Sequence, residues 1–422
     1  MPAISSGTAM ARSAAFDDIL LLDSANEPAS LTAAPGSRIF RITATHRMSD
    51  VEAVWRSLTA GPIESPGQSI DFIRLWVEAL RIPERDQFYV VAHLDDAPIA
   101  LVPLQRRWDS GARVLSWFPG PHVGCNAPIV DVARLQSLSP DERRRLWIKL
   151  LRSIAGADVV YMKSVPQLIV DGIDLFAEMG QVLGADTLYR AAFESFEDAD
   201  KTQRNKSRRK HDRQQGDRLA AMGEVAFEEI GNGSEALALL ETMFQQRAAR
   251  FRQMGVFDPF AIPMVRSFYD NTVHEESGTP VKLHVLRLNG DIVAVRYNIV
   301  HGDRLFCLIS SMSDDPAIQS GSPGKQCLLR VMQTVFDAGY RTFDMGEGLT
   351  DEKRHWCNVQ IPVRQHYIAL TPLGRLASSL HQTWQIGRKR IKENKQLLGF
   401  IKSVRSRLQK AKAETKASDT ED

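Results

Sequence analysis

The sequence predicts an α+β fold in which helices flank a mostly antiparallel mixed sheet, built twice along the chain. Hairpin patterns at residues 88–104 and 281–300 require antiparallel strand pairs. Each hairpin follows a strand and two helix patterns and precedes a helix and a strand, so the two halves share one order of elements. The length of 422 residues exceeds one ordinary core, and 43% apolar with 25% charged residues is typical of globular proteins.

The elements of the first half follow from apolar periodicities of two or of about 3.6 residues. The alternating residues 38–42 predict the first strand. The helix pattern at 70–80 places Phe72, Trp76 and Leu80 on one face. The remaining elements expected here are helices at 51–58 and 141–154 and strands at 88–94, 99–104, 113–117, 158–163 and 188–193.

The second half contains the clearest local signal. Asn289-Gly290 between alternating apolar runs predicts a type I′ turn. Ser234 is expected to cap a helix over 234–251. The other expected elements are helices at 263–274 and 322–338 and strands at 224–230, 281–288, 292–300, 304–311, 341–345 and 365–371.

These patterns divide the chain into four parts. Residues 1–37, rich in Ala, Ser, Thr and Pro, are expected to be disordered. Residues 38–198 and 199–375 are the two halves. Residues 376–422 form a basic tail, in which an amphipathic helix is expected with one apolar side, made of Leu397, Ile401, Val404 and Leu408.

Charge and cysteine content narrow the class of protein. The 53 basic and 51 acidic residues give a net charge of +2, so any basic binding surface must be local. The sequence has four cysteines, Cys125, Cys307, Cys327 and Cys357, and they lack the paired spacing of a zinc site. We therefore expect no bound metal, and we expect the thiols to be reduced. No apolar run approaches the roughly 18–20 residues needed to span a bilayer. We therefore expect a soluble, cytoplasmic protein.

The segment Ser320-Gly-Ser-Pro-Gly-Lys325 opens a predicted helix. Ser322 suits the N-cap, Pro323 the first helical position, and Gly324 leaves the backbone bare. Free N–H groups, the helix dipole and Lys325 together would bind an anion such as a pyrophosphate. A well-capped helix without a ligand gives the same pattern, so both interpretations stand. Gln326 after Lys325 excludes a Walker A loop.

A second polar segment lies at the carboxyl end of the strand expected at 341–345. Asp344 or Glu347 could orient an amine or accept a proton, and Lys353 could bind phosphate or a developing oxyanion. A glycine turn at Gly346 and Gly348 with solvated charges is the alternative. His355 is the histidine to test, because it lies beside Lys353. The sequence has neither G-x-S-x-G nor H-E-x-x-H, which excludes the common hydrolase motifs.

These segments, in this order, resemble the GNAT-type acetyltransferases of the cellulose-biosynthesis CelD family and, more distantly, the Fem peptidyltransferases. The resemblance covers about residues 200–372 and rests on four features: the basic stretch Arg204–Lys210, the hairpin 283–300, Ser322-Pro-Gly324, and Asp344-x-Gly346-x-Gly348 with Lys353. It implies tandem GNAT-like domains. It also implies that Ser322, Gly324 and Lys325 lie near an acyl donor, and that Asp344, Gly346, Gly348 and Lys353 line the acceptor side.

The leading hypothesis is acyl transfer from acetyl-CoA or another acyl-CoA to an amine or hydroxyl, as in envelope polysaccharide synthesis, with a small-molecule or saccharide acceptor. We weigh two alternatives. A Fem-like enzyme would use aminoacyl-tRNA, bound at the basic residues 201–213 or at the tail. A degenerate member would be a non-catalytic scaffold in polysaccharide synthesis or export. The basic helix at 383–412 either makes weak contact with an anionic membrane or covers its own chain.

Overall fold

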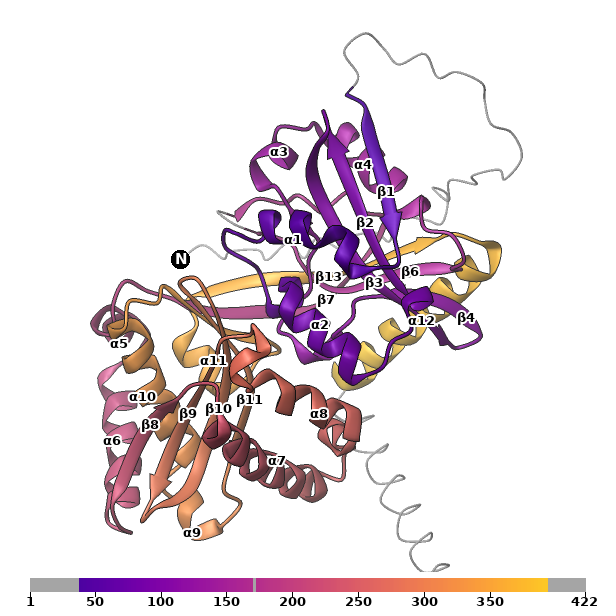
Figure 1. The fold of residues 1–422 in the computed structure, drawn as a ribbon. Coiled ribbons are helices and arrows are strands. Elements are labelled where there is room, and N and C mark those ends of the chain that lie inside the picture. The colour runs from indigo at the N-terminus through magenta and orange to yellow at the C-terminus, as the bar shows by residue number, and fades with distance from the viewer. Residues whose placement is uncertain (1–37, 170–171, 394–422) are drawn as a thin grey trace, which may run out of the picture. The chain divides into compact units, whose positions relative to one another are not determined.

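A computed structural model describes residues 38–169 and 172–393 (Figure 1). From Phe40 onward these residues form one compact unit. Its strands are β1 (Phe40–Thr45), β2 (Gln87–Leu94), β3 (Ala97–Asp109), β4 (Ala112–Ser116), β5 (Ile129–Val130), β6 (Val159–Pro166), β7 (Gln181–Ala192), β8 (Val225–Ile230), β9 (Val281–Leu288), β10 (Asp291–His301), β11 (Arg304–Met312), β12 (Thr342–Glu347) and β13 (Val359–Ala369). Its helices are α1 (Glu52–Leu58), α2 (Ile70–Ala79), α3 (Val132–Gln136), α4 (Pro140–Arg152), α5 (Phe196–Gln203), α6 (Lys206–Ala220), α7 (Ser234–Met254), α8 (Pro263–Thr272), α9 (Pro316–Gln319), α10 (Pro323–Asp337), α11 (Asp351–Trp356) and α12 (Pro372–Glu393).

The strands of the described residues join into one mixed sheet. Its order is β1-β2-β3-β4-β6-β13-β7-β12-β11-β10-β9-β8, with β5 paired to β3. Among the described strands only the β4–β6 and β11–β12 pairs are parallel, so the predicted mostly antiparallel sheet is confirmed. The two halves exchange strands at the centre, where β13 lies between β6 and β7 and β7 in turn pairs with β12 (Figure 1).

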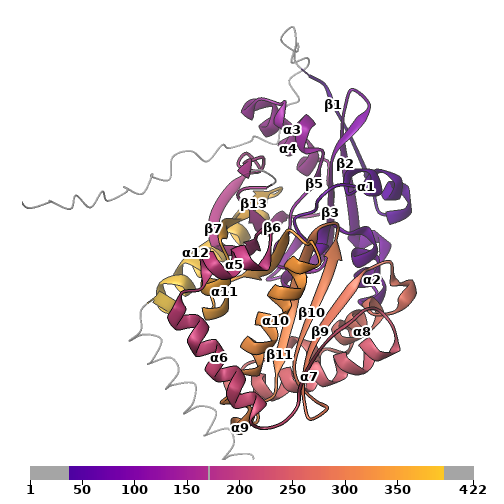
Figure 2. The ribbon, with the colours of Figure 1, turned by 90° about the vertical axis from the view of Figure 1, so that its left-hand side faces the viewer.

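Helices cover both faces of the sheet. In the second half, α6 and α10 lie on one face and α7 and α8 on the other (Figure 2). Alternate residues of β10 explain this arrangement, because Val295 and Tyr297 pack toward α7 and α8 whereas Ala294 packs toward α10. In the first half, α1 and α2 pack on one face, and α3 and α4 on the other.

One apolar core is shared by the two halves. Phe72 and Trp76 of α2 pack against Phe268 of α8, with ring centroids 4.9 and 5.0 Å apart. The same cluster includes Trp55 from the first half and Tyr297 from the second, both without measurable exposure. The aromatic face predicted for the helix at 70–80 therefore packs against the other half of the chain.

Local sequence signals set several boundaries. Asn289 and Gly290 have φ of 52° and 86°, as the predicted type I′ turn requires. The prediction of Ser234 as N-cap is wrong: Gly233, with φ of 138°, holds that position, and Ser234 is the first helical residue. β7 and β13 begin earlier than predicted, at Gln181 and Val359. The basic residues 201–213 contribute to two helices, α5 and α6.

The predicted disordered segment 1–37 lies outside the described residues, as does most of the expected tail helix with its apolar side chains at 397–408. Across 38–169 and 172–393, every helix is either too short or too polar to cross a membrane.

Candidate active site

The site begins where two parallel strands separate. β11 and β12 pair only from Arg304–Phe306 to Thr342–Asp344. Directly beyond, β11 bulges at Leu308, since Tyr297 faces Ile309 while Asn298 faces Cys307. β12 bulges between Asp344 and Glu347 against β7. Because bulges bend a strand, the two strands diverge and stop pairing with each other at this point.

A cavity of about 260 Å³ lies at this divergence. The second half contributes side chains from β11, from the β12 bulge and from α11. The first half contributes the loop after β4 and the end of β6. The lining residues are Pro121, His122, Val123, Gly124, Lys163, Ser164, Cys307, Leu308, Met345, Gly346, Glu347 and Lys353. The predicted residues Gly346, Glu347 and Lys353 therefore lie together in one pocket.

Two glycines allow the halves to meet beside the pocket. A Cβ on Gly124 would lie 3.0 Å from the Cα of Gly346 and 3.2 Å from Oδ1 of Asp344. Gly346 itself has φ of 76°, a conformation that side chains other than glycine rarely adopt. Gly348, with φ of 82°, donates its N–H to the Thr187 carbonyl at 3.1 Å and ends the strand. Gly346 and Gly348 thus shape the backbone beside the pocket.

Glu347 supplies a carboxylate in the pocket. Burial raises its pKa above the usual range, and a hydrogen bond from Ser164 and the charge of Lys163 oppose this rise. Its Oε1 atom is buried and has no hydrogen-bond partner among the described residues. A buried carboxylate with a free oxygen and a raised pKa is suited to accept a proton.

Lys353 places an ammonium group beside Glu347. Its Nζ donates to the carbonyls of Gly346 at 3.1 Å and of Glu347 at 2.5 Å, and thereby holds the β12 bulge. Burial lowers the pKa of Lys353, while Cys307, Cys357, Asp344 and Asp186 favour its charged form. An ammonium has three donors, so one remains for a ligand after these two bonds.

Asp344 lies behind the pocket and not in its lining. Its Oδ2 accepts from Nε of Arg190 at 2.7 Å, and its Oδ1 accepts from the N–H of Gly346 at 2.8 Å. Arg190 also pairs with Glu64 at 2.8 Å, and the side chains of all three residues are at most 7% exposed. Asp344 is therefore a residue that fixes the bulge, through Gly346, from within a buried ion cluster.

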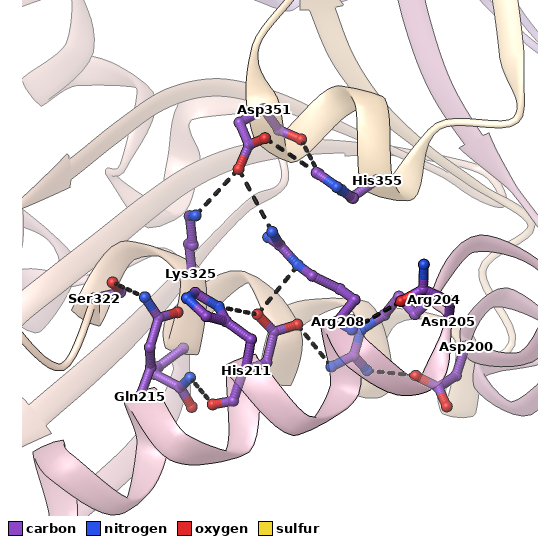
Figure 3. A network of polar contacts seen from close by, with 12 residues as sticks. Asp200, Arg204, Asn205, Arg208, His211, Gln215, Ser322, Lys325, Asp351 and His355 are labelled. Atoms are coloured by element: carbon purple, nitrogen blue, oxygen red, sulfur yellow. Dashed lines mark hydrogen bonds and ion pairs between the residues drawn. The ribbon is translucent and has the colours of Figure 1, made fainter.

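The residues predicted to bind the acyl donor lie around the N-terminus of α10. Lys325 Nζ lies 3.1 Å from Oδ2 of Asp351, and Arg208 Nη1 lies 3.6 Å from the same oxygen (Figure 3). His355 Nδ1 hydrogen-bonds the Asp351 carbonyl at 2.6 Å and lies 3.4 Å from Oδ1. The bond from Lys325 is the main reason that the pKa of Asp351 is lowered. His355 thus lies with the residues around the N-terminus of α10 and not in the pocket.

Ser322 holds the N-cap position without capping the helix. Its backbone is left-handed, with φ of 51°, and its hydroxyl accepts from Nε2 of Gln215 at 2.6 Å. The predicted side-chain cap is therefore wrong, since a capping side chain needs an extended backbone at that residue. The Ser322 carbonyl accepts from the N–H groups of Lys325 and Gln326, both at 3.0 Å. Gly324 lies where α10 meets β11, and a Cβ there would be 3.1 Å from Sδ of Met312.

The structure adds residues that the sequence did not single out. His122, Lys163 and Ser164 come from the first half and reach the pocket only through the tertiary fold. His122 Nδ1 lies 3.1 Å from the Tyr269 hydroxyl, and burial lowers the pKa of His122 to about 4. Cys307 stood out only as one of four scattered cysteines, and burial raises the pKa of its thiol.

Part of the chain matches a known family model, and its fold is similar to that of a solved structure. Residues 206–354 match the family model of the acetyltransferase (GNAT) domain, which extends from α6 through α11. The crystal structure of FemX superimposes with a TM-score of 0.50 at 11% identity and covers 74% of this chain and 99% of FemX. No curated protein matches the sequence significantly.

Two further solved structures are less similar. L-PGS from Bacillus licheniformis has a TM-score of 0.44 at 13% identity, with 76% of this chain and 97% of that one covered. A tandem GNAT protein from the clavulanic acid biosynthesis pathway has a TM-score of 0.39 at 9% identity, with 79% and 99% covered. The chain has the predicted α+β fold, a mostly antiparallel mixed sheet flanked by helices, and residues 206–354 within it match a GNAT domain.

Proposed function

We propose that this protein transfers an acyl group from an acyl-CoA thioester to an amine or hydroxyl in the pocket between β11 and β12. The observation that carries the proposal is the divergence of these strands inside the segment that matches a GNAT domain. Backbone groups that no longer pair across the gap can bind an extended donor chain as an added strand would. The diphosphate of the acyl-CoA would then lie toward Lys325 of α10 and Arg208 of α6.

Glu347 and Lys353 supply the chemistry in this proposal. The acceptor nitrogen or oxygen attacks the thioester carbonyl carbon and loses its proton to the Glu347 carboxylate. The Lys353 ammonium stabilises the negative charge that develops on the carbonyl oxygen. The C–S bond then breaks, and CoA leaves as a thiolate that takes up the proton held by Glu347, so the carboxylate is regenerated. Asp344 and Gly346 position the bulge that holds both groups.

The acceptor would approach from the first half of the chain. His122, Lys163 and Ser164 line that side of the pocket and present polar atoms to an incoming molecule. The resemblance of residues 200–372 to the CelD-type enzymes supports a saccharide amine or hydroxyl in envelope polysaccharide synthesis.

The test is thiol release from acetyl-CoA and longer acyl-CoAs with a panel of amino sugars and polyols. We expect Glu347→Gln to lower kcat by about 100-fold or more with little change in acyl-CoA affinity. Because the carboxylate must be ionised to act, wild-type kcat should rise with pH through the raised pKa of Glu347, and the variant should lose this rise. Glu194→Gln, a change on the surface, is the matched control. Equal turnover by both variants would contradict the role of Glu347.

One observation supports a second candidate function, transfer from aminoacyl-tRNA. α6 exposes Lys206, Lys210 and Arg213 at spacings of four and three residues, which place them on one face. A cationic face of this kind attracts a nucleic-acid backbone. Under this alternative, replacing all three by Glu should abolish a tRNA gel shift and leave acetyl-CoA affinity unchanged. Wild-type protein that fails to shift tRNA at low salt would eliminate this candidate.

A further inference from the structure

The outer face of α12 carries an apolar stripe that nothing in the described residues covers. Leu373, Leu376, Leu380 and Trp384 follow one another at spacings of three, four and four residues, which place them on one side of a helix. Their exposed fractions are 47, 58, 63 and 55%. An ordinary surface helix shows the reverse, with such residues turned to the core.

The inner face of α12 is small and polar, and it holds the helix in this orientation. A Cβ on Gly374 would lie 1.7 Å from the carbonyl oxygen of Asp158 on the sheet. His381 Nδ1 hydrogen-bonds the Tyr367 hydroxyl at 2.9 Å, and Gln382 Nε2 donates to Gln181 at 3.1 Å. Rotation of the helix to bury its leucines would break each of these contacts, so the stripe stays exposed.

The charge of the helix indicates which partner suits this stripe. From Pro372 to Glu393 the sequence has five cations, Arg375, Arg388, Lys389, Arg390 and Lys392, and one acidic residue, Glu393 at the end of the helix. The Arg388 guanidinium lies 5.3 Å from the ring centroid of Trp384, which joins the cationic and apolar parts. Apolar side chains flanked by cations fit a surface that is apolar below and anionic above.

We propose that the outer face of α12 binds an anionic phospholipid surface. Leu376, Leu380 and Trp384 enter the headgroup boundary, while arginines contact lipid phosphates. A second copy of the chain fits less well, because a symmetric contact would oppose two cationic helices. RNA would use the cations but leave the leucines in water. This surface is independent of acyl transfer in the pocket.

The experiment is sedimentation of full-length protein with vesicles of phosphatidylcholine alone and with 30 mol% phosphatidylglycerol, at low and high salt. We expect binding to the anionic vesicles only, weakened by salt. Leu376→Gln/Leu380→Gln/Trp384→Gln should weaken binding at least about tenfold, and Arg388→Gln/Arg390→Gln should do so at low salt. The matched control, Trp108→Gln/Leu349→Gln, removes exposed apolar groups elsewhere and should bind as wild type.

Four outcomes would overturn the proposal. Equal binding to both vesicle types, or equal loss in the control and the stripe variants, would remove the role of α12. Protein that shifts RNA but ignores vesicles would assign the face to nucleic acid. Binding that appears only after deletion of residues 1–37, which include the acidic apolar run Asp17–Asp23, would assign the face to that segment of the chain. Circular dichroism of each variant verifies its fold.

Discussion

At the scale of residues, ionisable groups near the pocket divide into those that face it and those that support it. Glu347 and Lys353 line the cavity, whereas Asp344, Arg190 and Glu64 form the buried cluster behind it. Buried ion pairs cost desolvation, and removal of one partner leaves a charge without compensation. The two groups should therefore respond differently to mutation.

We expect Asp344→Asn to lower the free energy of unfolding by about 3 kcal/mol, because Arg190 loses one of its two carboxylates in a buried site. Chemical denaturation at pH 7 measures the change. Asp96→Asn is the matched control, since Asp96 pairs with Arg41 while 92% exposed and should change stability little. If Asp344→Asn unfolds at the wild-type midpoint yet loses turnover, Asp344 has a direct catalytic role instead.

A buried histidine makes stability depend on pH. His366 of β13 is fully buried, neither ring nitrogen has a hydrogen-bond partner among the described residues, and burial lowers its pKa to about 4. The histidine pKa in the unfolded chain is about 6.5. Between this pH and 4, His366 is therefore protonated in the unfolded chain and neutral in the folded chain. Stability from this group is present above pH ~6.5 and is lost as the pH falls toward 4.

Replacement of His366 by leucine should remove this dependence. At pH 5 the wild-type protein is expected to lose about 2 kcal/mol through His366 relative to pH 7. The difference in unfolding free energy between pH 7 and pH 5 should shrink by this amount in His366→Leu. An unchanged slope in His366→Leu would show that other groups cause the acid sensitivity.

At the scale of elements, α11 connects the pocket with the residues around the N-terminus of α10. Three successive side chains reach three different elements: Asp351 pairs with Lys325 of α10, Glu352 with Arg296 of β10 at 2.8 Å, and Lys353 with the β12 bulge. The Asp351 carboxylate thus neutralises cations that a donor diphosphate would need. Binding of the diphosphate is expected to compete with Asp351 for Lys325 and Arg208.

Asp351→Asn should therefore tighten CoA binding by about fivefold at low salt, with less effect at high salt. Pantetheine, which lacks the diphosphate, should bind equally to both proteins. Isothermal titration calorimetry with the two ligands measures the difference. Asp200→Asn is the control, because Asp200 pairs with Arg204 and Arg209 and not with Lys325. Weaker CoA binding in Asp351→Asn would show that Asp351 organises the donor site.

At the scale of the whole molecule, the two halves contribute interleaved strands to one sheet. β7, which precedes the predicted boundary at 198, pairs with β12 of the second half. β13, which follows that boundary, fills the space between β6 and β7. The shared aromatic cluster around Phe72 and Phe268 adds a common core. Division at residue 198 would expose strand edges and apolar surface on both fragments.

We expect neither residues 38–198 nor residues 199–393 to fold alone, and the two fragments to associate when expressed together. Residues 38–393 should unfold in a single cooperative transition. Circular dichroism and analytical ultracentrifugation of the separate and mixed fragments test this expectation. A cooperative melt of either isolated fragment would show that the predicted boundary separates independent domains.

Features that depend on neighbouring residues could be predicted from the sequence. The type I′ turn at Asn289-Gly290, the apolar stripe of α2 and the start of α10 at Ser322-Pro-Gly324 each depend on neighbouring residues, and each element lies where it was predicted. The carboxyl end of β12 was likewise a predicted site, and Glu347 of β12 shares a pocket with Lys353 of α11. The predictions that failed were the caps at Ser234 and Ser322 and the starts of β7 and β13. The two strands pair with each other over the added length, which is a contact between distant segments.

The sequence by itself determined the class of fold and one wall of the candidate site, since periodicity and turn residues act over a few positions. Only the tertiary structure decided the strand exchange, the approach of Gly124 to Gly346, and the opposite wall with His122 and Ser164. It also decided that α12 turns its leucines outward, because Gly374 must lie against Asp158. These features join residues 150 or more positions apart, and steric fit between distant segments leaves no local pattern.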